Sequence, residues 1–163
     1  MADRDRPESV PPVDPDIVDV ASSPLHLRPW AIAAVAVGGL VGAPARYGLE
    51  LVFPQAAGQW PVTTFVINVV GAFLLGLLLE GLTRTGPDTG WRRQMRLGVG
   101  TGLLGSFTTY STLAVDTDTL LRGQQWWAAA SYAAGSVVVG LAATVLGIAV
   151  GARMPSRREE SGR

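Results

Sequence analysis

The chain contains no cysteine and no lysine, and its only histidine is His26. The lack of cysteine excludes disulfides and thiolate metal sites. His26 stands near the N-terminus without a catalytic partner, so we interpret it as a tail residue. Metal-ligand spacings, nucleophile elbows and phosphate loops are also absent, and the glycines at 98, 100 and 102 lack the strand and spacing of a dinucleotide-binding fingerprint. The sequence therefore does not indicate an enzyme.

Charge is scarce as well. Charged residues make up 16% of the 163 residues, against roughly 25% in soluble domains, while hydrophobic residues make up 48%. Residues 30–45, 62–79, 97–115 and 123–152 carry no charge. These stretches approach or exceed the ~20 residues that cross a bilayer as a helix, the first only with flanking residues. We predict an all-α membrane protein with four transmembrane helices, because so short a chain lacks the protein needed to bury four apolar helices in a soluble domain.

The two ends of the chain differ from its middle. Residues 1–29 are rich in aspartate and proline and contain no apolar run preceded by basic residues, so they do not read as a signal peptide. We predict a disordered cytoplasmic tail over residues 1–29, a transmembrane domain over residues 30–152 and a short cytoplasmic tail over residues 153–163.

The arginines predict the orientation in the membrane. Eleven of them fall in the two tails and in the link between the second and third predicted helices, whereas only Arg46 and Arg122 fall on the opposite side. Because basic residues concentrate on the cytoplasmic side, both termini are expected in the cytoplasm.

The most informative segment is residues 98–112, where glycines and hydroxyl residues interrupt an apolar stretch. Ser106, Thr108, Thr109, Ser111 and Thr112 follow four glycines there. Bilayer hydrocarbon tolerates polar groups and irregular backbone only where protein buries them or where they line a path, so this density predicts a broken third helix that faces a site. The alternative is a glycine-rich packing face whose hydroxyls bond back to their own helix.

Other polar residues interrupt the remaining helices. Arg46 ends the first span, and Asn68 lies near the middle of the second, where it either links two helices or lines a pathway. Tyr132 and Ser136 are four residues apart and share one helical face. Two carboxylates that close their spans, Glu80 and Asp116, are interpreted as interfacial ends.

Three of these segments together resemble the small bacterial fluoride channels called Fluc or CrcB. The segment Gly-Gly-Leu-Val-Gly-Ala-Pro-Ala-Arg-Tyr ends with Arg46 and Tyr47, the segment at residues 64–76 centres on Asn68, and the third is Gly-Leu-Leu-Gly-Ser-Phe-Thr-Thr-Tyr-Ser-Thr at residues 102–112. Their order is specific, and the resemblance covers roughly residues 30–152. It implies a passive, selective exporter that lowers fluoride toxicity and lies in the bacterial inner membrane as an antiparallel dimer with two pores.

The resemblance also implies particular sites. A structural sodium ion at the dimer centre is expected to bind backbone carbonyls at the third-helix break, here those of Gly105 and Thr108. Fluoride is small and strongly hydrated, so a pore has to replace its water with hydrogen-bond donors, whereas free carbonyls suit a hard cation. Arg46 either supplies a field for an anion or anchors its helix. The expected ion pathway comprises Arg46, Asn68, Tyr110, Ser111, Thr112, Tyr132 and Ser136.

One departure from the family pattern concerns the aromatic residues. The family usually carries phenylalanine after Thr-Thr and after Ser-Thr, where electropositive ring edges line the anion path, but this chain has Tyr110 and Leu113. Together with the arginine bias, this favours one subunit of a heterodimer with a homologous partner. The alternatives are a non-conducting structural subunit and a small proton-coupled multidrug transporter. Such transporters need a carboxylate in the first span, and here none precedes Glu50.

Overall fold

The computed structural model describes residues 28–56 and 58–154, and these residues form helices and no strand. The prediction of an all-α protein is therefore confirmed. His26 and nearly all of both predicted tails lie outside the described residues. The helices, in chain order, are α1 (Pro29–Val52), α2 (Val62–Thr85), α3 (Gly90–Met95), the π-helix η2 (Arg96–Leu104), α4 (Gly105–Phe107), α5 (Tyr110–Arg122) and α6 (Trp126–Gly151).

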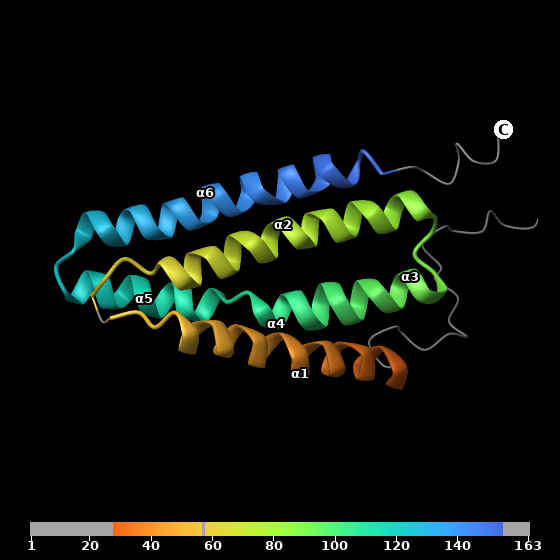
Figure 1. Ribbon diagram of the computed structural model, residues 1–163, viewed down its shortest axis with the longest axis horizontal. Coiled ribbons are helices and arrows are strands. Elements are labelled where there is room, and N and C mark those ends of the chain that lie inside the picture. The colour runs from red at the N-terminus through yellow and green to blue at the C-terminus, as the bar shows by residue number, and fades with distance from the viewer. Residues whose placement is uncertain (1–27, 57, 155–163) are drawn as a thin grey trace, which may run out of the picture.

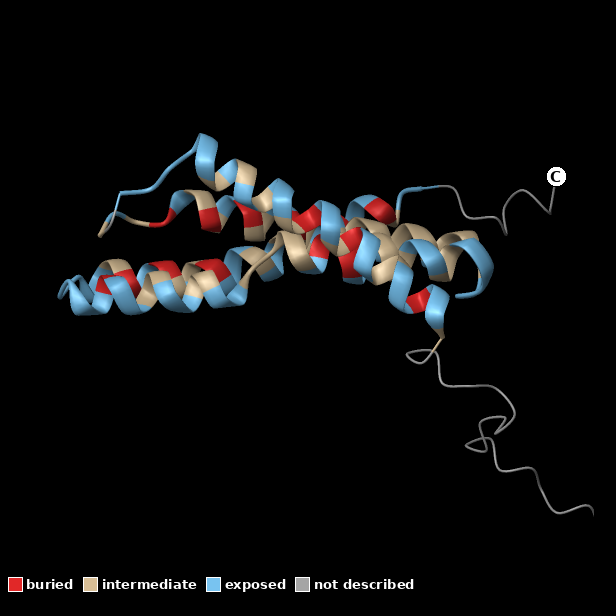
Figure 2. Cartoon of the chain, turned by 90° about the horizontal axis from the view of Figure 1, so that it is seen from below, coloured by how far each residue is buried: buried red, intermediate tan, exposed pale blue. Residues whose placement is uncertain are grey.

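Within the described part of the chain, α1, α2 and α6 are the three helices long and apolar enough to cross a membrane. They contain 24, 24 and 26 residues, and a helix of 24 residues is about 36 Å long, enough for a hydrocarbon layer of about 30 Å. Large apolar side chains such as Leu40, Val138 and Leu141 are exposed, and exposed residues cover much of the helices in Figure 2. An apolar exterior of this extent suits lipid as the solvent.

The helices pack in two close pairs, α2 with α6 and α1 with η2 (Figure 1). Glycines permit both approaches. A Cβ atom at Gly42 of α1 would overlap the backbone carbonyl of Leu103, and one at Gly147 of α6 would overlap the carbonyl of Phe73. Small residues at such contacts let backbones approach closely, which is the usual means of helix association inside a membrane.

The helical path is interrupted between α4 and α5. Thr108 (φ −78°, ψ 155°) and Thr109 (φ −146°, ψ 121°) are extended, so α4 ends at Phe107 and a new helix starts at Tyr110 (Figure 1). The Thr109 hydroxyl accepts a hydrogen bond from the Thr112 amide over 3.1 Å and so caps α5. The interruption therefore falls among the hydroxyl residues that the sequence singled out.

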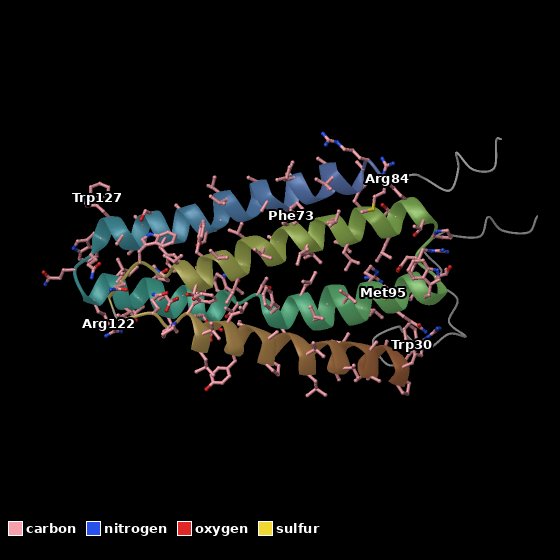
Figure 3. The ribbon with its side chains drawn as sticks, viewed as in Figure 1. Trp30, Phe73, Arg84, Met95, Arg122 and Trp127 are labelled. Carbon is pink, nitrogen blue, oxygen red and sulfur yellow. The ribbon has the colours of Figure 1, made fainter. Side chains whose placement is uncertain are left out.

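The two ends of the molecule carry different side chains. Figure 3 shows Trp30, Arg84 and Met95 at one end and Arg122 and Trp127 at the other. At the first end, Arg96 donates two hydrogen bonds to the Asp88 carboxylate, over 3.1 and 2.8 Å. These hydrogen bonds lower the pKa of Asp88 below its ordinary value, so the link between α2 and α3 remains an ion-paired loop at neutral pH.

Candidate functional site

The interruption is clamped by a side chain from another helix. Asn68 of α2 donates from Nδ2 to the Thr109 carbonyl over 3.0 Å, and its Oδ1 accepts from the Thr109 amide over 2.8 Å. Both backbone groups of Thr109 are thus satisfied without help from their own helix. Asn68 links two elements, and its second Nδ2 hydrogen takes no part in this clamp.

The remaining backbone groups of the interruption divide into bonded and unbonded carbonyls. The Leu104 carbonyl accepts from the Thr108 amide at 3.0 Å and from the Thr108 hydroxyl at 2.9 Å, and the Ser106 carbonyl accepts from Arg46 Nε at 3.4 Å. Within the described residues, no hydrogen bond reaches the carbonyl of Gly105, Phe107 or Thr108. Backbone carbonyl oxygens of this kind are ligands that a hard cation accepts.

An open groove of about 330 Å³ runs beside the interruption, between α2, α5 and α6. We call it the break groove. Ser136 is 7% exposed, and its hydroxyl has no hydrogen-bond partner among the described residues. Tyr110, by contrast, is 82% exposed at the edge of the groove. The groove brings together seven residues that the sequence analysis named, namely Asn68, Gly105, Thr108, Thr109, Tyr110, Leu113 and Ser136.

A second concavity of about 330 Å³, here the polar cavity, lies between the end of α1, the start of α2 and α5. Thr112 and Asp116 line it from α5, one helical turn apart. Asp116 Oδ2 accepts from the Thr64 hydroxyl at 3.1 Å and from the Tyr132 hydroxyl at 3.3 Å. The interpretation of Asp116 as an interfacial end missed this role, in which one carboxylate ties α2, α5 and α6 together.

Tyr132 is turned away from solvent entirely. Its exposed fraction is 0%, and the Trp60 ring lies edge-on to it with ring centroids 5.4 Å apart. Its hydroxyl points to Asp116 and not to the neighbourhood of Ser136, although the two residues share a helical face. Ser111 contacts the Thr109 hydroxyl over 3.1 Å. Of the expected pathway residues, Asn68, Tyr110 and Ser136 line the break groove, Thr112 lines the polar cavity, and Ser111 and Tyr132 line neither.

Arg46 lies on α1, where Glu50 accepts from its Nη1 over 3.2 Å. Its Nε reaches the Ser106 carbonyl, so the side chain joins α1 to the end of α4. This geometry supports the helix-anchoring interpretation of Arg46. Among residues 28–56 and 58–154, no group of three or more His, Cys, Asp or Glu side chains is placed to hold a metal.

Comparison with known proteins identifies relatives of the whole helical region. A family model described as "CrcB-like protein, Camphor Resistance (CrcB)" matches residues 33–148. The chain is 49% identical over 138 residues to "Fluoride-specific ion channel FluC 2" of Leifsonia xyli, covering 85% of this chain and 94% of the relative. It is 50% identical over 133 residues to "Fluoride-specific ion channel FluC 3" of Streptomyces avermitilis, covering 82% of this chain and 64% of the relative. A third relative, "Fluoride-specific ion channel FluC 1" of Cutibacterium acnes, is 43% identical over 116 residues.

Proposed function

The chain belongs to the CrcB family of fluoride channels, and from this premise we propose that it is one subunit of a dimeric channel that lets fluoride leave the cytoplasm passively. Such export lowers fluoride toxicity. The observation that carries the proposal is the break groove, where the Ser136 hydroxyl has no partner among the described residues and one N–H of Asn68 takes no part in the clamp. Hydrogen-bond donors of this kind replace the water around a small, strongly hydrated anion.

The pathway that we propose starts in the polar cavity and continues to the break groove. Thr112 lines the first, and Asn68, Tyr110 and Ser136 line the second. Ser111 precedes Thr112 on α5, and its hydroxyl contacts that of Thr109. Tyr132 contributes indirectly, because its hydroxyl donates a hydrogen bond to the carboxylate of Asp116, which lines the polar cavity. Residues 90–122 are proposed to cross the membrane as a fourth, broken span, with Thr108 and Thr109 at mid-depth.

The assembly that we propose is an antiparallel dimer in the inner membrane. The openness of the break groove and the 82% exposure of Tyr110 support it, because a second subunit would complete the wall of the pathway. The unbonded carbonyls of Gly105 and Thr108 would hold a structural sodium ion at the dimer centre. Leu113 also lines the groove and offers no ring edge to an anion, which supports a homologous partner that carries the missing aromatic residues.

Fluoride efflux from liposomes tests the proposal. Vesicles loaded with potassium fluoride receive this chain alone, a candidate homologous partner alone, or both, and a fluoride electrode follows release after a potassium ionophore is added. We expect fluoride but not chloride release when both chains are present. Proton-driven uptake of an organic cation would instead indicate a multidrug transporter, and the absence of any flux with every partner would indicate a structural subunit.

A further inference from the structure

Arg46 contacts the C-terminal end of α4. In a continuous helix the Ser106 carbonyl would accept from the amide of residue 110, but that amide belongs to the next helix, after two extended residues. Arg46 Nε reaches this carbonyl from α1 at 3.4 Å. A positive charge at a helix C-terminus also opposes the partial negative charge of the helix dipole.

Glu50 fixes the direction of the Arg46 side chain. The two residues are one turn apart on α1, their charged groups are 3.2 Å apart, and both are about three-quarters covered, with side-chain exposures of 26% and 28%. Close packing of α1 on the same stretch supports this arrangement, because Gly42 lies against the Leu103 carbonyl and Gly39 lies opposite the Ser106 hydroxyl. The guanidinium group is therefore held by α1 at the end of α4 and does not extend freely into the polar cavity.

We propose that Arg46 is a positioning residue that holds the end of α4 so that the carbonyls of Gly105 and Thr108 can bind a cation, an inference that rests on the proposed function. The Leu104 carbonyl accepts hydrogen bonds from the Thr108 amide and hydroxyl, and the Ser106 carbonyl accepts one from Arg46. Among the described residues, the carbonyls of Gly105, Phe107 and Thr108 accept none. Loss of the Arg46 contact would free the end of α4 and weaken this arrangement of carbonyls.

The test measures stability as a function of sodium. Purified dimers are equilibrated with increasing sodium against a large organic cation at constant ionic strength, and thermal unfolding gives the sodium concentration of half-maximal stabilisation. We expect Arg46→Met to raise this concentration about tenfold, as the loss of one hydrogen bond from a charged group predicts, with near-normal stability at saturating sodium. Arg46→Lys, which keeps the charge and one donor, should lie between Arg46→Met and the unaltered protein.

The matched control is Arg122→Met, which removes one charge from an arginine that contacts Asp118 and not the interruption. It should leave the sodium requirement unchanged. The inference would be overturned if both Arg46 variants kept the sodium requirement of the unaltered protein. It would also be overturned if the stability of the unaltered protein did not depend on sodium. An equal loss of stability at every sodium concentration would also overturn it, because Arg46 would then be a packing residue only. Fluoride flux is measured separately, so its absence would reject the proposed function without altering the sodium result.

Discussion

At the scale of single residues, the site depends on polar side chains that satisfy backbone groups of a neighbouring helix. Asn68 does this for Thr109, and Arg46 does it for Ser106. Ser136 is different, because its hydroxyl is buried and unpartnered. The two classes should respond differently to substitution.

Asn68→Leu should reduce both fluoride flux and stability, because the partly buried amide and carbonyl of Thr109 lose their partners, at up to about 1–3 kcal/mol for each unsatisfied group. Ser136→Ala should reduce flux with little change in stability, since no hydrogen bond is lost within the subunit. Thermal unfolding and liposome flux on the same samples compare the two variants. Full flux in Ser136→Ala would remove this hydroxyl from the pathway.

Sequence reasoning found these residues more readily than it found their partners. Asn68 and the hydroxyl residues stand out because polar groups are costly in apolar segments. Asp116 was missed because its partner Thr64 is 52 positions away, and a carboxylate at the end of a charge-free stretch is ordinarily an interfacial residue. The signal that marks it is the Thr112–Asp116 spacing, which places both side chains on one face of α5.

At the scale of helices, apolar composition predicted the long elements well. The stretch at residues 123–152 corresponds to α6 at Trp126–Gly151, and that at residues 62–79 lies within α2. The stretch at residues 97–115 instead spans parts of η2, α4 and α5. Apolar composition does not show that this helix ends at Phe107, because the backbone groups of Thr109 that follow are bonded by Asn68 of another helix.

Gly42→Ala should destabilise the protein by about 1–3 kcal/mol, because the added methyl group overpacks the contact between α1 and the Leu103 backbone. Gly48→Ala is the matched control on the same helix. Its Cβ would meet nothing within 4 Å, so this variant should be neutral or stabilised by about 0.5–1 kcal/mol through the better helix propensity of alanine. Denaturant unfolding in detergent measures both, and equal stability of the two variants would contradict the proposed role of the close contact.

At the scale of the whole molecule, the distribution of arginine is the dominant feature. Among the described residues, the end with Arg84 also carries Arg92, Arg93 and Arg96, and these four arginines outnumber the carboxylates there, Glu80 and Asp88. On α1 and at the other end, Arg46 and Arg122 are matched by Glu50 and Asp118. The described residues therefore carry an excess of positive charge at the Arg84 end. An antiparallel homodimer would need half of its chains to insert against this bias.

This chain expressed alone should fail to protect a fluoride-sensitive bacterium, and co-expression with a homologous partner of opposite arginine bias should restore growth. The reason is that nearly all copies would insert with their termini in the cytoplasm and meet one another in parallel. Growth in fluoride and reporter tags at the C-terminus provide the measurement. Protection by the chain alone, with tags found on both sides, would support a homodimer and leave the fluoride-channel assignment intact.

The clamp between Asn68 and Thr109 has a consequence for how transport is controlled. Because one amide group holds both the donor and the acceptor of a single residue, the joint between α4 and α5 resists bending, and it needs no water to complete its bonds. A stiff joint is a poor gate, since opening and closing would require both hydrogen bonds to break together. We expect a pore beside such a joint to conduct continuously, so the cell would adjust fluoride efflux through the number of channels it makes.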